Sequence, residues 1–339
     1  MKKKAIYLAM AVLAACSCAK SPVIGLNDAD KAYLAAWVQL NHPNATKTAL
    51  GSYILEDTPG TGALVSDSDT NPFVRLEYEI RGLDGSVQQT YSKEMAQRLG
   101  TYSVESYYGP MTQPRGEGYT PAGLEEVISD MRVGGRRTVL IPGWLLSTRQ
   151  YYKTAKDYEN NVSGTTAIYD ITVKDAISDI NKWETDSVGR YILKTFPGMT
   201  PRDSVKYGFY YKRTGQPSSL REFPADTIIY INYVGRLLNG QVFDTSIRDT
   251  AAYYGLYSSS RSYGPVKITW YTDSGTYSDI KFGDSSGAID GFLYALMQMH
   301  PHEKGAAVFY SGLGYSSKGT SSIPAYSPLR FDIEVVDEP

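Results

Sequence analysis

An aromatic side chain and a carboxylate stand next to each other at Phe243-Asp244, three positions after the dipeptide Asn239-Gly240. Asn-Gly between alternating runs is a strong signal for a two-residue β-hairpin turn. The segment INYVGRLLNGQVFDTS therefore predicts a hairpin with Tyr233 on the partner strand. One short hairpin thus carries two aromatic rings and a carboxylate, and the sequence has to explain why they occur together.

A hairpin of the same form lies upstream, where residues 76–92 read LEYEIRGLDGSVQQTYS. Asp84-Gly85 takes the place of the turn, and Tyr78 matches Tyr233. Gln88-Gln89 stand where the downstream hairpin has Phe-Asp, so the chemistry of the two hairpins differs.

Other kinds of chemistry have little support in the sequence. His42, His300 and His302 lie in turn contexts beside proline, and no spacing of Cys, His and Asp predicts a metal site. We read the three histidines as structural or solvent-facing, and we expect no metal and no cofactor. The net charge of -2 argues against a nucleic-acid partner.

The N-terminus has the pattern of an export signal. A positive segment, Lys2 to Lys4, precedes an apolar run at 5–15 that is too short to span a membrane. Leu13-Ala14-Ala15-Cys16 resembles the lipobox of bacterial lipoproteins, which implies a signal peptide at 1–15, acylation of Cys16 and a tether at 16–26. An ordinary signal peptide with a chance cysteine is the alternative.

The cysteine count agrees with an anchor. The chain has only two cysteines, Cys16 and Cys18, so no disulfide framework is available downstream. The expected location is the cell envelope, lipid-anchored at the outer membrane on its periplasmic side.

The remaining sequence reads as two copies of one α+β unit, 27–177 and 178–339. Each copy begins with a helix, capped by Asn27 in the first and by Ser178 in the second. A strand then precedes each hairpin, expected at Ser52 to Glu56 and at Tyr207 to Lys212. A short helix and closing strands end both copies.

The second copy resembles the FKBP-type peptidyl-prolyl cis-trans isomerases between residues 207 and 336. The resemblance rests on landmarks that occur in the family's order and at compatible spacing: Tyr233, Gly235, Leu237, Gly240, Phe243, Asp244 and Ser246, then Ile289, Gly291 and Phe292, then Tyr315, and finally Phe331-Asp332. It implies two FKBP-like domains, each an antiparallel sheet wrapped around a short helix and preceded by an N-terminal helix.

The resemblance also implies roles for individual residues. Four aromatic residues would line a pocket for a proline ring, namely Tyr233, Phe243, Phe292 and Phe331. Asp244 and the Tyr315 hydroxyl would form its polar rim, and the Ile289 N–H would meet a substrate carbonyl. Ile323 matches the apolar residue of a flap over the pocket.

The implied reaction needs no nucleophile. Rotation of an X–Pro amide breaks no bond, but loss of amide resonance gives a barrier of roughly 18–20 kcal/mol. A twisted amide is less polarised than a planar one, so an apolar, water-poor pocket favours it differentially.

The sequence departs from the family pattern in both copies. Phe292 stands where the family usually has tryptophan, and an insert at about 249–285 leaves one pocket aromatic unassigned. In the first copy Gln88-Gln89 and Leu124 replace the site residues. We therefore expect a degenerate domain there, used for binding, dimerisation or spacing.

The sequence thus predicts a membrane-anchored prolyl isomerase that assists the folding of proline-containing exported polypeptides, with its active site in the second copy. A non-catalytic peptide-binding or chaperone module is the alternative. A scaffold or glycan-binding lipoprotein that uses its 29 tyrosines is a third possibility. The oligomeric state is left open.

Overall fold

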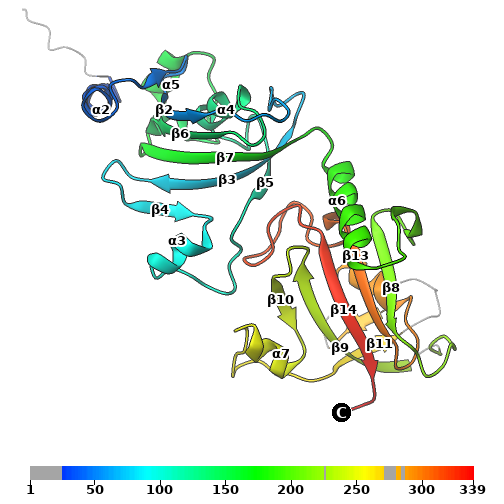
Figure 1. Cartoon of the computed structure of the whole chain (residues 1–339). Coiled ribbons are helices and arrows are strands. Elements are labelled where there is room, and N and C mark those ends of the chain that lie inside the picture. Colours follow the sequence, from blue (N-terminus) through cyan, green and yellow to red (C-terminus); the bar gives the residue numbers. More distant parts are fainter. Residues whose placement is uncertain (1–24, 225–226, 271–279, 284–286) are drawn as a thin grey trace, which may run out of the picture.

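The structure is a computed structural model that describes residues 25–224, 227–270, 280–283 and 287–339. The predicted signal peptide, Cys16 and most of the tether lie outside the described residues, as do 271–279 and 284–286 of the insert. Figure 1 shows two sheets in separate parts of the molecule, joined by α6. In the described ranges, no helix combines the length and apolar character needed to cross a bilayer.

The first domain contains one sheet and its helices. Its elements are α2 (Asp28–Asn41), β1 (Thr46–Lys47), β2 (Tyr53–Thr58), β3 (Phe73–Arg81), β4 (Val87–Thr90), α3 (Lys93–Arg98), β5 (Met111–Pro114), α4 (Ala122–Ser129), β6 (Arg136–Ile141), η2 (Gly143–Leu145), α5 (Ala155–Asn161) and β7 (Ala167–Ile177).

The second domain begins two residues after β7. Its elements are α6 (Ile180–Thr195), η3 (Pro201–Asp203), β8 (Phe209–Gly215), β9 (Thr227–Leu237), β10 (Val242–Thr245), α7 (Arg248–Tyr253), β11 (Val266–Trp270), β12 (Ile280–Phe282), α8 (Asp290–Leu296), β13 (Lys304–Phe309), η5 (Ser311–Leu313) and β14 (Leu329–Val336).

The two sheets have the same strand order. The first runs β2-β6-β7-β3-β4 with β5 also on β3, and the second runs β8-β13-β14-β9 with β10 and β11 on β9. The pairings within both sheets are antiparallel. The predicted α+β fold class and its internal repeat are confirmed.

The hairpins match residue by residue. In the second domain Asp244 pairs with Gly235, and a bulge places Phe243 outside the ladder. In the first domain Gln89 pairs with Ile80, and the pairing is again interrupted one residue earlier. The strand partners Phe331 and Tyr169 complete the match, because they lie opposite Gly235 and Ile80, respectively.

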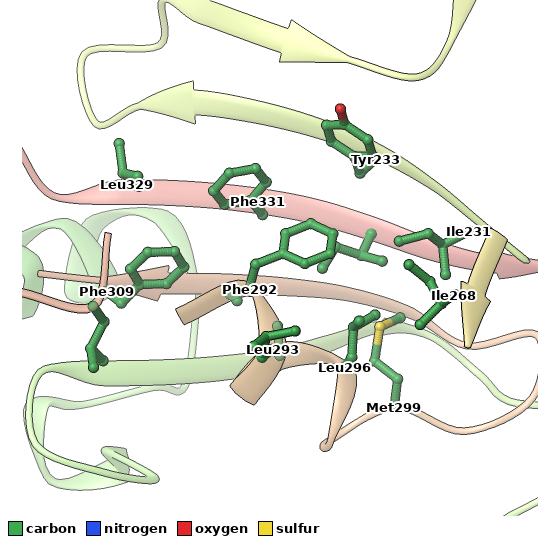
Figure 2. Close-up of a cluster of buried hydrophobic side chains, with 14 of the residues drawn as sticks. Ile231, Tyr233, Ile268, Phe292, Leu293, Leu296, Met299, Phe309, Leu329 and Phe331 are labelled. Atoms are coloured by element: carbon green, nitrogen blue, oxygen red, sulfur yellow. The ribbon is translucent and has the colours of Figure 1, made fainter. Parts of the chain in front are cut away.

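The core of the second domain lies between the sheet and α8. Alternate residues of β14 are buried, as expected for a strand with one face on the core. Figure 2 shows Phe292 projecting from α8 toward Phe331 and Tyr233, with Leu293 and Leu296 packed on the same helix. The sheet therefore wraps around one short apolar helix.

Of the two predicted helix caps, one is confirmed in position and the other is wrong. Asn27 is the N-cap residue of α2 but makes no capping side-chain hydrogen bond, and its amide nitrogen instead donates to the carbonyls of Glu159 and Val162 at 2.7 Å. The cap of α6 is Asp179, whose carboxylate accepts from the Lys182 N–H, rather than Ser178. The predicted first strands are also shifted by one to three residues, since β2 and β8 begin and end later than expected.

The leading helices dock differently in the two domains. α2 reaches α5 through the Asn27 contacts just described. α6 lies against the outer face of its sheet, where Val188 and Ile192 pack with Ala306 and Val308. The buried Glu184 of α6 accepts hydrogen bonds from the Ser311 N–H at 2.6 Å and from its hydroxyl at 2.7 Å. α6 is thus attached to the loop that leads to the predicted site.

Candidate functional site

All eight predicted pocket residues line one cavity of about 380 Å³ in the second domain. That volume falls in the range of small-ligand sites, roughly 300–1,000 Å³. Four strands, two loops and the start of α8 supply the lining: Tyr233, Phe243, Asp244, Phe282, Gly287, Ala288, Ile289, Phe292, Tyr315, Thr320, Ser322, Ile323 and Phe331. Their roles in turnover stay predictions, but the sequence correctly identified a set of residues that meet in space.

Aromatic rings form the walls. The ring of Phe292 lies 5.1 Å from that of Phe331 and 5.7 Å from that of Tyr233, both edge-to-face. Phe243 packs edge-on against Phe331 at 5.6 Å. Edge-to-face pairs are favoured by the aromatic quadrupole, so these rings hold one another in place. The result is a pocket with preformed apolar walls.

Gly235 leaves the space for two of these rings. A Cβ at this position would lie 2.7 Å from the Phe243 ring and 2.8 Å from the Phe331 ring. Such contacts are shorter than van der Waals distance, so any side chain at residue 235 would displace the walls. The glycine of the hairpin is thus part of the pocket.

Asp244 forms the polar side of the pocket. Its carboxylate accepts from the Tyr233 hydroxyl at 2.6 Å and from the Thr245 N–H at 2.9 Å. Arg261 pairs at 2.6 Å with Oδ1, the oxygen that also accepts from Thr245, and donates to the carbonyl of Thr245. The rim is therefore a hydrogen-bonded ion pair, with the Asp244 side chain 34% exposed.

Two hydroxyls at the pocket stay protonated. Burial, and then the charge of Asp244, raise the pKa of Tyr315. Burial likewise raises the pKa of Tyr233, and Asp244 raises it further. Both hydroxyls are therefore donors at neutral pH, and Tyr233 already donates to Asp244 whereas Tyr315 borders the cavity.

Ile289 presents a backbone donor. It precedes the first residue of α8 in an extended conformation, where a helix leaves its first N–H groups without intrahelical acceptors. Among the described residues, the Ile289 N–H donates no hydrogen bond. This amide can therefore bind a carbonyl oxygen at the mouth of the cavity.

The loop at 316–328, which we call the flap, carries Ile323 over the pocket. Ile323 is buried, with 2% of its surface exposed. The Thr320 N–H donates to the Ile323 carbonyl at 2.7 Å, and the Thr320 hydroxyl accepts from the Ile323 N–H at 3.1 Å. The Tyr326 N–H closes the loop on the Ser316 carbonyl at 2.8 Å.

Sequence reasoning missed two residues, Phe282 and Arg261. Both belong to the insert at 249–285, whose Tyr/Ser/Gly-rich composition gave no register. Phe282 on β12 packs edge-on against Phe292 at 5.4 Å and lines the cavity. It therefore supplies the aromatic residue that the sequence left unassigned. An arginine before an aromatic-rich strand carried no signal that it would reach Asp244.

The equivalent place in the first domain is filled by its own side chains. Tyr91 packs on Tyr78 at a centroid distance of 4.8 Å, and the two hydroxyls are hydrogen-bonded. Ile80 replaces Gly235, so a branched side chain occupies the position that must be empty in the second domain. Gln88 and Gln89 are exposed rather than buried.

The histidines take no part in this pocket. His300 contacts Glu303 and His302 contacts Asp337, while His42 packs on Trp37. In the part of the chain that the structure describes, no group of three or more potential ligands is placed to hold a metal ion.

Comparison of the sequence with family profiles and with curated proteins gives no match. Among solved structures, the three FKBP domains of wheat FKBP73 cover 84% of this chain and 94% of their own, with 14% identity and a TM-score of 0.29. A peptidyl-prolyl cis-trans isomerase from Pseudomonas syringae covers 46% and 94%, with 21% identity and a TM-score of 0.30. FkpA from Escherichia coli covers 47% and 62%, with 21% identity and a TM-score of 0.31.

The wheat protein carries the family name of the motif resemblance. At these identities and TM-scores the similarities support no statement about activity.

Proposed function

We propose that the chain is a peptidyl-prolyl cis-trans isomerase whose catalytic centre is the aromatic pocket of the second domain. The observation that carries the proposal is one cavity lined by the rings of Tyr233, Phe243, Phe292 and Phe331, with Asp244, Tyr315 and Ile289 in the same lining. A pyrrolidine ring is a flat apolar group of the kind that such walls enclose, and the flanking peptide groups would remain at the polar rim.

The mechanism is differential binding of the twisted amide. In the planar X–Pro amide, resonance places negative charge on the oxygen, and water stabilises that charge. Transfer into apolar walls removes the water, so the planar form loses more than the twisted form does. The Tyr315 hydroxyl and the Ile289 N–H are placed to hold substrate carbonyls while the bond rotates. No bond is made or broken.

The direct test is the rate of cis-trans exchange in short peptides with a bulky apolar residue before proline. The chain from residue 25 onward should accelerate this exchange above the uncatalysed rate, which corresponds to tens to hundreds of seconds. Magnetisation-exchange NMR measures the rate without a coupling protease. A folded, monodisperse protein that leaves the exchange unchanged in several X–Pro peptides would overturn the proposal.

A peptide-binding module without turnover is the second candidate. The observation that favours it is the first domain, where the same strand order occurs with the site filled by Tyr91 and Ile80. Calorimetric titration with the same peptides separates the two candidates. Binding with exchange supports the enzyme, and binding without exchange supports the module.

We also propose that Cys16 is acylated and holds the protein at the outer membrane, on the periplasmic side, where exported polypeptides containing proline would be its substrates. The support is the sequence pattern that ends at Leu13-Ala14-Ala15-Cys16. Cys16→Ser should move the protein from the membrane fraction into a soluble exported pool. Cys18→Ser is the matched control and should leave the protein in the membrane fraction. A Cys16→Ser protein that stays in the membrane would contradict the anchor.

A further inference from the structure

The first domain contacts the flap of the second domain. Phe73, the first residue of β3, packs edge-to-face on Tyr326 with ring centroids 5.1 Å apart. Tyr326 lies three residues after Ile323, which covers the aromatic pocket. An aromatic contact from one domain thus ends close to the apolar lid residue of the other.

The flap separates two cavities. Ile323 lines the aromatic pocket, whereas the next residues, Pro324 to Pro328, line a second cavity of about 330 Å³. Arg75, Tyr107 and Thr112 of the first domain form part of the wall of this second cavity. The first domain therefore lies behind the flap, on the side away from the aromatic pocket.

The first domain also contacts the hairpin that carries Phe243 and Asp244. The Gln241 amide, beside the turn, donates to the Ser106 carbonyl at 3.1 Å. Tyr107 packs against the core of the second domain. The hairpin and the flap form two sides of the pocket, and both touch the same neighbouring domain.

The connection between the domains is short and is itself held. The indole N–H of Trp183 on α6 donates to Asp175 on β7 at 2.5 Å. Arg75 lies over the same indole at 5.6 Å from the ring centroid. These contacts fix the direction in which α6 leaves β7, and so they keep Phe73 near the flap.

We propose that the first domain is a positioning element for the pocket, with Phe73 holding the flap through Tyr326 so that Ile323 stays over the bound residue. This inference rests on the proposed function for its kinetic readout, but its structural readout does not depend on catalysis. It gives the degenerate domain a role that needs no ligand of its own.

The physical reason is that the flap makes its backbone hydrogen bonds locally. Among the described residues they lie within the loop or reach only Ser311 and Tyr315 just before it. A loop without backbone bonds to a neighbouring strand can open locally at low free energy, so an outside contact has a large influence on it. An edge-to-face aromatic pair contributes about 0.5–1.5 kcal/mol beyond area burial, equivalent to a factor of roughly two to ten in the ratio of closed to open flap. Loss of Phe73 should therefore weaken binding by as much as that factor.

The experiment compares Phe73→Ala with the wild type in the full chain. The KM for an X–Pro peptide should rise about two- to tenfold with little change in kcat, because the flap binds ground state and transition state alike. Hydrogen exchange should become faster at the amides of Thr320, Ile323 and Tyr326. Amides of β14 should exchange as before. Tyr33→Ala on α2 is the control, an exposed aromatic away from the flap that should change neither quantity.

Tyr326→Ala tests the same contact from the other side. Its φ of 56° is unfavourable for both tyrosine and alanine, so the substitution removes the ring without a new backbone requirement. The double variant should bind the peptide as tightly as either single variant does, because both substitutions remove the same contact. If Phe73→Ala unfolds the first domain, Tyr326→Ala alone must still produce faster exchange in the flap.

The outcomes are distinguishable. Unchanged flap exchange in Tyr326→Ala and in a folded Phe73→Ala overturns the positioning role, whatever the enzyme does. If the wild type binds peptides without turnover, the proposed function fails, and the positioning role is then tested by the dissociation constant. A larger dissociation constant for Phe73→Ala than for the wild type, together with faster hydrogen exchange in the flap, supports the positioning role. Additive effects in the double variant overturn the proposed pairing.

Discussion

The two domains have one strand order and two different interiors at the same place. In the second domain the hairpin carries Gly235 and Phe243, and four walls enclose an open pocket. In the first domain Ile80 and Gln88 occupy the matching positions, and Tyr91 packs where the pocket would be. Both sheets are complete, so the pocket is not needed to form the fold.

The difference shows that very few positions decide whether this fold contains an open pocket. The alternation of buried residues along β7 and β14 sets the sheets, and it is present in both domains. The open pocket depends on an absent side chain at residue 235 and on a ring at residue 243. Exchanging these residues between the domains therefore tests whether they cause the difference.

The largest effect is expected from Gly235→Ile, which gives the second domain the residue of the first. The new side chain would enter the space of the Phe243 and Phe331 rings, so we expect turnover to fall to the uncatalysed rate. Overpacking should also lower the free energy of unfolding by about 1–3 kcal/mol. NMR exchange and thermal unfolding measure the two effects. Ile80→Gly is the reciprocal control, and turnover gained by the first domain would contradict the comparison.

Phe243→Ala should have the next largest effect. Removing this wall admits water, and we expect turnover to fall about tenfold or more, which corresponds to about 1.4 kcal/mol in the activation free energy. The cost in stability should be below the about 3–5 kcal/mol of a fully buried phenylalanine, since Phe243 is half-buried. Circular dichroism must first show a folded protein. Gln88→Ala, the exposed counterpart, should be neutral in both measurements; equal losses would mean that residue 243 has no special role.

Asp244→Ala should reduce turnover by a smaller factor, about three- to tenfold, because it removes the acceptor of Tyr233 and Arg261 without opening a wall. Stability should change by less than about 1 kcal/mol, since this ion pair is partly exposed. Arg261→Gln, which leaves the carboxylate in place, separates the effect of the charge from that of the pairing. A protein without Asp244 that works at full rate would remove the rim from the mechanism.

Tyr315→Phe should have the smallest effect, a loss of about two- to threefold, because only one neutral hydroxyl is deleted and we expect its hydrogen bond to contribute about 0.5 kcal/mol, the low end of the usual net value. The ring remains, so the unfolding temperature should not change. Tyr91→Phe in the first domain is the matched control and should leave the exchange rate unaltered. A hundredfold loss of the exchange rate would contradict this prediction, because it exceeds what one hydrogen bond to a carbonyl contributes.

The fold and most of the pocket could be predicted from the sequence because both depend on local sequence patterns. The two turns, Asn239-Gly240 and Asp84-Gly85, set the hairpin register, and the register fixes which side chains share a face. Phe282 and Arg261 escaped because they come from an insert whose position depends on tertiary pairing of β11 and β12 rather than on local composition.

The helix caps were predicted only in part, for a different reason. Neighbouring polar residues compete to cap a helix, and the sequence does not show which of Ser178 and Asp179 accepts the bond. Asn27 holds the predicted N-cap position, but the distant carbonyls of Glu159 and Val162 bind its amide. The docking of α2 and α6 was likewise beyond local patterns, since both have an apolar stripe and only one lies on its sheet.

The buried carboxyl of Glu184 makes the second domain sensitive to protons. Burial raises its pKa from the ordinary value of 4.5, although the hydrogen bonds from Ser311 oppose this. The folded protein therefore binds a proton more tightly than the unfolded chain does. The stability from this group is complete below pH 4.5 and is lost as the pH rises through the raised value. Attachment of α6 to the loop before Tyr315 should thus be firmest in mild acid, so a fall in pH would stabilise this part of the protein.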